Sequence, residues 1–134
     1  VEDVFDAYPG KIRAKLMPLR ELIFDTASKL CNVGPLEETL KWGQPSYLTK
    51  QSKSGTTIRI DQDRSKPIQY GMYVHCQTSL LATYREYYLD ILRFDGNRYI
   101  EFDVENDPPE EAMRHCIQLA LTYHRSKRRD RLPF

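Results

Sequence analysis

The sequence predicts an α+β fold, in which an antiparallel sheet of about five or six strands carries N-terminal, middle and C-terminal helices. Three segments, 9–30, 79–91 and 107–123, place apolar residues at helical spacing. The segments between them alternate apolar and polar residues and have short polar connections. Connections this short join antiparallel neighbours, because parallel strands need a long crossover. The 134 residues are expected to form one domain, 1–134, large enough to bury its own core.

The first helix is expected over residues 9–30, because Pro9 is a favoured first helical residue and an apolar stripe follows it. Pro18 lies inside this segment and has no backbone N–H, so a kink or restart of the helix is expected there. Asn32 and Gly34 predict the end of the helix. The stripe consists of Ile12, Leu16, Leu19, Ile23, Ala27 and Leu30.

Four strands follow, and the first of them ends in the only tryptophan of the chain. In the segment 37–42, Leu40 and Trp42 fall on one side of an extended strand. Gly43 and Pro45 are then expected to end the strand and turn the chain. The other three strands are predicted near 46–49, 56–60 and 68–76.

The rest of the chain predicts a middle helix, a hairpin strand and a last helix. Residues 95–97, Asp-Gly-Asn, are a hairpin turn signal, and the strand after them, 98–104, places Ile100 inward and Glu101 outward. Asp107 precedes two prolines and two acidic residues, which is typical of a helix N-terminus. The middle helix has a stripe of Leu81, Tyr84, Tyr88 and Ile91, and the last helix one of Ala112, Cys116, Leu119, Ala120 and Tyr123.

Two motifs carry a resemblance to a known family. The segment ETLKWGQPSY, residues 38–47, follows a predicted helix that contains LxxLRELI, residues 16–23. Together they resemble the YdhG-like domain family, small bacterial α/β domains that are mostly of unknown function. The resemblance runs from Tyr8 to about Tyr123 and implies an α+β arrangement broadly similar to the frataxin sandwich. Some members are described as frataxin-like iron chaperones, so the resemblance implies iron as a ligand.

Composition favours a soluble cytoplasmic protein. Lys and Arg number 20 and Asp and Glu 19, a net charge of +1, so no overall field selects nucleic acid or a membrane. The basic run 125–131 is typical of a solvated helix end, and nucleic acid is not expected as a partner. Three cysteines without a CxxC pair favour free thiols in a reducing cytoplasm. No apolar run is long enough to cross a bilayer, and a monomer and a homodimer both fit the sequence.

Trp42, Gln44 and Tyr47 are the first candidates for a ligand site, because aromatic rings with polar tips suit small molecules and peptides. The alternative is that Trp42 belongs to the core and that Tyr47 covers its edge. On that alternative, loss of the indole mainly lowers stability. These residues predict no cofactor.

Tyr73 and His75 share one face of the predicted strand 68–76 and are a second pair of candidate ligand-binding residues. A small enzyme with a site near them is one alternative function, with His75 as its titratable group. Cys76 points to the opposite face, so it cannot share a metal ion with His75 while the strand is regular. The sequence has no GxSxG, P-loop, GxGxxG or HExxH motif. The leading prediction is therefore a non-enzymatic binding or interaction module. Its partner is expected to be either a small molecule or a protein, and the sequence does not distinguish the two.

Glu101, Asp103 and Glu105 are the candidate metal ligands. Alternate residues of a strand share a face, and hard cations prefer carboxylate oxygens. An intracellular iron-binding chaperone, the activity that the resemblance implies, is therefore another alternative function. The competing interpretation is a solvated strand face that leads into a helix N-terminus, where acidic residues are favourable.

Overall fold

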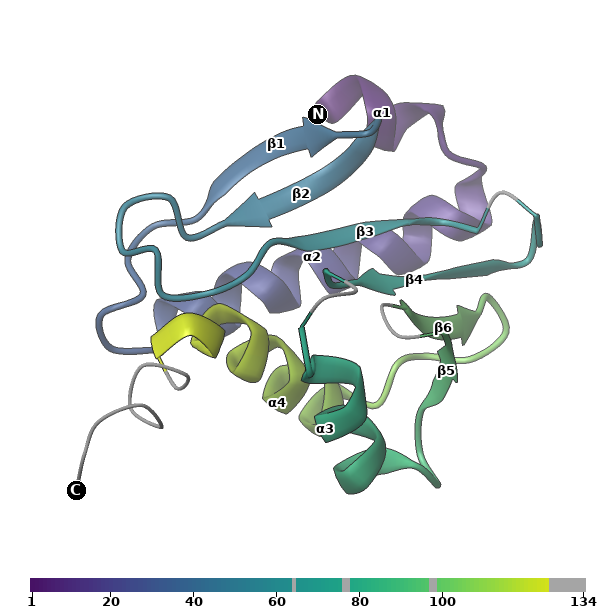
Figure 1. Cartoon of the computed structure of the whole chain (residues 1–134). Helices are drawn as coiled ribbons and strands as arrows, with labels where there is room; N and C mark the ends of the chain where they lie inside the picture. The colour runs from purple at the N-terminus through teal and green to yellow at the C-terminus, as the bar shows by residue number, and fades with distance from the viewer. Residues whose placement is uncertain (64, 76–77, 97–98, 126–134) are drawn as a thin grey trace.

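The computed structural model describes residues 1–63, 65–75, 78–96 and 99–125, which form a six-stranded antiparallel sheet with helices packed against it (Figure 1). The strand order is β1-β2-β3-β4-β6-β5, and every neighbouring pair is antiparallel. The predicted α+β fold is confirmed. The strands are β1 (Glu37–Lys41), β2 (Gln44–Leu48), β3 (Ile58–Gln62), β4 (Gln69–Tyr73), β5 (Arg93–Asp95) and β6 (Tyr99–Asp103). The helices are α1 (Glu2–Ala7), α2 (Gly10–Ser28), α3 (Leu80–Tyr88) and α4 (Glu110–Leu121).

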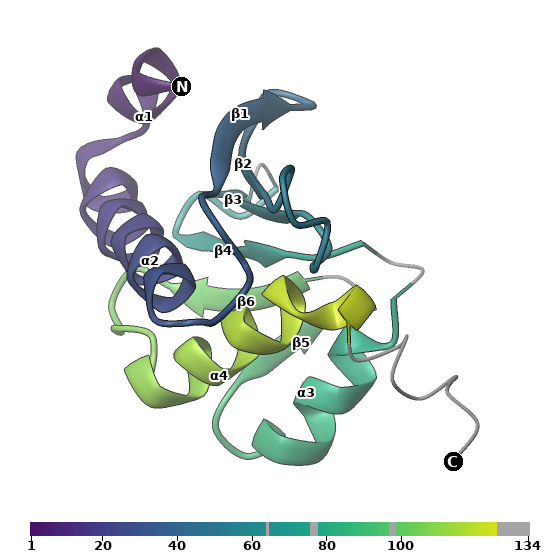
Figure 2. The same cartoon turned by 90° about the vertical axis from the view of Figure 1, so that its left-hand side faces the viewer.

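The long helix α2 covers one face of the sheet. It runs behind β3 and β4 in Figure 1, and the view along it in Figure 2 shows α4 packed beside it. Successive side chains of a strand point to opposite sides, so alternate residues of the sheet face this helix layer. Six of them are fully buried in the core: Tyr47, Ile58, Ile60, Tyr70, Met72 and Ile100.

α2 is one helix of 19 residues that starts one position later than predicted, with Pro9 as its N-cap. The restart expected at Pro18 is not found, since the helix continues through this residue. Pro18 and Ala14, whose carbonyl loses its N–H partner, are both exposed, so water can satisfy the freed carbonyl. No helix within the described ranges is long and apolar enough to cross a membrane.

A two-residue turn made of Trp42 and Gly43 joins β1 to β2. Both residues have positive φ, 58° and 76°, as a type I′ hairpin turn requires. The first strand therefore ends at Lys41 and not at the tryptophan, and β2 starts directly after the turn. Pro45 does not end a strand but lies inside β2. The pair that closes such a turn is hydrogen-bonded and the next pair is not, so the proline loses no bond to β1.

The loop between β2 and β3 closes the C-terminal end of α4. The Ser54 hydroxyl donates to the carbonyl of Leu121 at 2.8 Å, and the Thr56 N–H donates to that of Ala120 at 2.9 Å. The last carbonyls of a helix have no partner inside it, so the loop supplies one. A Cβ on Gly55 would lie 2.5 Å from the Leu121 Cα, so this approach requires glycine. Because Thr56 serves this contact, β3 begins later than the predicted position 56.

Candidate functional site

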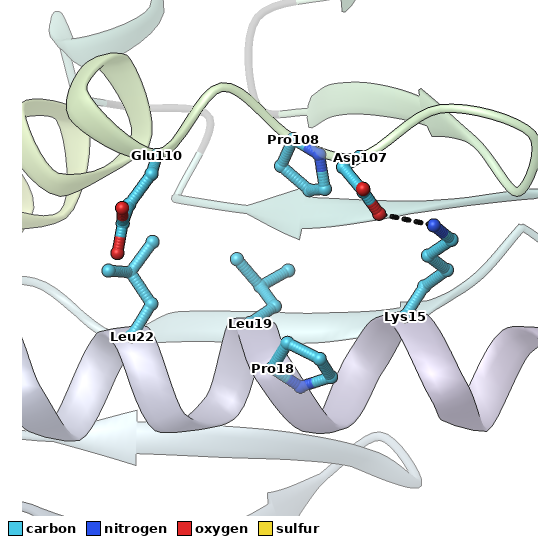
Figure 3. Close-up of a pocket in the computed structure, with 7 residues that line it drawn as sticks. All are labelled: Lys15, Pro18, Leu19, Leu22, Asp107, Pro108 and Glu110. Carbon is cyan, nitrogen blue, oxygen red and sulfur yellow. Dashed lines mark hydrogen bonds and ion pairs between the residues drawn. The ribbon is translucent and has the colours of Figure 1, made fainter.

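A groove lies between α2 and the segment that leads into α4. Its deeper part is a pocket of about 200 Å³ (Figure 3), and a shallower hollow of about 560 Å³ continues it along the two helices. The two parts share Pro18, Leu22 and Glu110. The other lining residues are Lys15, Leu19, Asp107 and Pro108 in the pocket and Met17, Glu21, Asp25 and Arg114 in the hollow.

The floor of the groove is apolar and comes from one side of α2. Leu19 and Leu22 are three residues apart, so both project toward the loop before α4 (Figure 3). Leu19 is almost fully buried, whereas Leu22 is half-buried and presents its side chain to the opening. Pro108 forms the facing wall. A floor of this kind suits an apolar side chain of a ligand.

Ion pairs lie at both ends of the groove. Lys15 pairs with Asp107 beside the pocket (Figure 3). Arg114 reaches Asp25 at 2.6 Å and Glu110 at 3.4 Å in the hollow. The hydrogen bond from Arg114 is the main cause that holds the pKa of Asp25 below its ordinary value. These pairs join α2 to α4 and to the loop before it.

The lining of the groove is acidic in balance. Two cations and four anions contribute, which leaves a net charge of −2. Three of the anions already pair with a lining cation, whereas Glu21 pairs with its neighbour Arg20 at 3.1 Å on the exposed side of α2. The cations are Lys15 and Arg114, and the anions are Glu21, Asp25, Asp107 and Glu110.

Gln44 and Tyr73, two of the predicted site residues, share a neighbour on the face of the sheet opposite α2. Arg59 donates to Gln44 Oε1 at 3.3 Å, and its guanidinium carbon lies 5.9 Å from the centre of the Tyr73 ring. Gln44 Nε2 in turn donates to Asp61 Oδ2 at 3.0 Å, and the Tyr8 hydroxyl donates to Asp61 Oδ1 at 2.7 Å. Asp61 is buried, and a buried carboxylate is stable only with such donors. These contacts therefore join residues of this face of the sheet to one another and stabilise the fold.

Tyr73 also stacks on Tyr99, with ring centroids 4.3 Å apart. Gly71 makes this possible, because a Cβ at its position would approach the Tyr99 ring to 2.4 Å. Burial raises the pKa of Tyr73 to about 12 and that of Tyr99 above its ordinary value. Both phenols are neutral near pH 7, so neither is a base there. His75, the expected partner of Tyr73, is exposed beyond the end of β4, and Cys76 lies outside the described residues.

Trp42 and Tyr47 lie in environments opposite to those that the core interpretation expected: Trp42 is on the surface and Tyr47 is in the core. Trp42 is 87% exposed at the hairpin turn, so its assignment to the core is wrong. Tyr47 is fully buried: its ring meets Phe24 of α2 edge-on at 5.5 Å, and its hydroxyl donates to Glu38 Oε2 at 2.9 Å. Gln44 lies on the opposite face of β2 from Tyr47. The structure does not bring the three residues together in one pocket.

Glu101, Asp103 and Glu105 do not form the expected row. β6 ends at Asp103, and Glu105 follows in a turn where its N–H donates to Asp103 Oδ1 at 2.9 Å. Glu101 was expected to point outward into solvent, but it is 9% exposed and accepts a hydrogen bond from Lys66 Nζ at 3.0 Å. Within the described parts of the chain, no group of three or more His, Cys, Asp or Glu side chains is arranged to hold a metal ion.

The groove was not predicted from the sequence. Its leucines are ordinary members of an amphipathic helix, and its acidic residues resemble a helix start. Nothing in the pattern indicates that Lys15 meets Asp107, which lies 92 positions later. The prolines at 18 and 108 were the available signal, because each is a rigid apolar residue that lies outside the buried core.

Comparisons with protein-family models, with curated proteins and with solved structures give no match. Only the geometry of the described residues therefore bears on the function of the chain.

Proposed function

We propose that the chain is a non-enzymatic binding module that takes a short basic and apolar peptide segment in the groove between α2 and α4. The observation that carries the proposal is the pocket of about 200 Å³ with an apolar floor and a charged rim. Ligand sites typically combine apolar surface, which supplies affinity, with a few polar groups that fix orientation.

The apolar floor predicts that the partner inserts one apolar anchor residue into the groove. A leucine or phenylalanine side chain placed over Leu19 and Leu22 would be removed from contact with water. Full burial of such a side chain contributes about 1.5–3 kcal/mol to the free energy of binding. The hollow extends the site along α2, so flanking residues of the same segment have room beside the anchor. Peptide grooves beside helices use anchors in this way.

The charge of the rim predicts that the partner is basic. The groove has a net charge of −2, and Glu21 lies on its exposed side without a lining cation within ion-pair distance. Lysine or arginine residues next to the anchor would meet this carboxylate and that of Glu110. Exposed pairs of this kind add about 0.2–1 kcal/mol each and are screened by salt. A single anchor with two such pairs supplies about 5 kcal/mol at most, which gives a dissociation constant in the submillimolar range or weaker.

Fluorescence anisotropy with a labelled peptide of Lys, Arg, Leu and Phe tests the proposal. The basic peptide should bind, and its acidic analogue with Asp and Glu in place of Lys and Arg should not. Leu22→Ala should weaken binding about tenfold through the lost apolar contact. Glu21→Lys should weaken it by a similar factor, and more at low salt.

Glu86→Lys is the matched control, because Glu86 is an exposed acidic residue on α3, away from the groove. It makes the same change in net charge and should leave the affinity unchanged. Equal weakening by Glu86→Lys and Glu21→Lys would mean that the peptide follows the overall charge of the protein. That result, or the absence of binding, would contradict the proposal.

A further inference from the structure

We propose that two copies of this chain associate through the edge strand β1, antiparallel and with Thr39 on the two-fold axis. β1 is the outermost strand at its end of the sheet, and Figure 1 shows it at the margin of the molecule. Within the described residues, its backbone groups pair only with β2. An edge strand presents a row of unpaired N–H and C=O groups, which is a template for another strand.

The hydrogen-bond pattern of the β1–β2 hairpin fixes which groups face outward. Lys41 and Gln44 close the two-residue turn, so theirs is a hydrogen-bonded pair. Because such pairs alternate, Thr39 also directs its N–H and C=O toward β2, whereas Glu38 and Leu40 direct theirs to the free edge. A two-fold axis at Thr39 places Glu38 opposite Leu40 of the other copy. Each such pair exchanges two N–H···O bonds.

The same register matches the charges of the strand. It places Glu37 opposite Lys41 of the other copy, and by symmetry Lys41 opposite Glu37. Both side chains share a face of β1 with Thr39, and opposite charges directly across two strands are stabilising. Lys41 makes no ion pair with any described residue, and Glu37 has only the exposed Lys50 at 3.5 Å. A shifted register would lose these cross-strand pairs.

Exposed apolar side chains lie at the same edge. Leu40 is 40% exposed and Trp42 is 87% exposed, and the two-fold arrangement brings Trp42 of each copy toward Leu36 of the other. Burial of an aromatic ring supplies the apolar contact that five residues of backbone pairing lack. The interface does not involve the groove between α2 and α4, so it is independent of the peptide-binding proposal.

Sedimentation over a wide range of protein concentration tests this inference. Wild type should pass from monomer to dimer, and emission of the only tryptophan should shift to the blue as it leaves water. Glu37→Lys or Lys41→Glu alone should weaken the dimer about tenfold, since like charges then face each other across the axis. The double variant should restore association. A protein that stays monomeric, or a dimer that ignores the single variants, would overturn the proposal.

Cross-linking tests the register itself. In a background with both Cys31→Ser and Cys76→Ser, which leaves the buried Cys116 as the one native cysteine, Thr39→Cys should form a disulfide-linked dimer under mild oxidation. Residues facing each other in a non-hydrogen-bonded pair have Cα atoms about 4.5 Å apart, within disulfide reach. Lys41→Cys is the control, because its symmetry mate lies about 13 Å along the strand. Equal cross-linking of both variants would contradict the register.

Discussion

Trp42 occupies a backbone conformation that few bulky residues adopt. Its φ of 58° places it in the left-handed region, at the first position of the hairpin turn. Alternation alone placed this residue in the core beside Leu40, but the turn removes it from the strand and leaves it exposed. A tryptophan held at some backbone cost on the surface is better explained by contact with a partner than by packing within one chain.

Trp42→Asn should therefore leave folding intact or improve it. Asparagine before Gly43 gives the favoured Asn-Gly sequence of a type I′ turn, and the expected gain is about 0.5–1 kcal/mol. Urea unfolding at a concentration where the chain is monomeric measures this change. The same variant should weaken dimer formation. A stability loss of about 3 kcal/mol or more would restore the core assignment.

At the scale of elements, the β1–β2 hairpin is attached to α2 by one polar cluster. Arg20 of α2 donates to both carboxylate oxygens of Glu38, at 2.5 and 3.1 Å, and the Tyr47 hydroxyl donates to the same group at 2.9 Å. Burial alone would raise the pKa of Glu38, but the hydrogen bonds from Arg20 and Tyr47 outweigh it and leave the pKa below 4.5. The charged form of Glu38 therefore stabilises the fold.

The lowered pKa of Glu38 predicts how the free energy of unfolding depends on pH. The folded-state pKa of Glu38 is lowered, so its contribution is complete above the unfolded value of 4.5 and is lost as pH falls through the lower folded value. Glu38→Gln should cost about 1–3 kcal/mol at pH 7. Urea melts of both proteins should show that this difference shrinks below the unfolded pKa. An equal loss at neutral and acidic pH would mean that the charge of Glu38 contributes nothing.

The strands and helices were largely predictable because their signals are local. The alternation in β3, β4 and β6 correctly placed Ile58, Met72 and Ile100 in the core. Glu101 shows the limit of such reasoning: alternation predicts its face, but not that it is buried or that it accepts a hydrogen bond from Lys66 of a distant loop. Pro45 shows another limit, since its place in β2 depends on the geometry of the turn before it.

At the scale of the whole molecule, the groove depends on tertiary structure. Its walls come from α2 and from the segment before α4, and all six strands lie between these two parts of the chain in the sequence. Periodicity explains each wall separately but does not indicate that they face each other. The resemblance to YdhG-like domains and the iron alternative remain predictions, because the fold and the groove test neither.

The most direct test of the binding proposal is an NMR titration of the ¹⁵N-labelled protein with the basic peptide, at a concentration where the chain is monomeric. We predict that amide shifts change along α2 from Lys15 to Asp25 and at residues 107–114, which together form the groove. Leu22→Ala should reduce these changes at equal peptide concentration. Changes confined to β1 and the hairpin turn, or spread evenly over the acidic surface, would contradict the account.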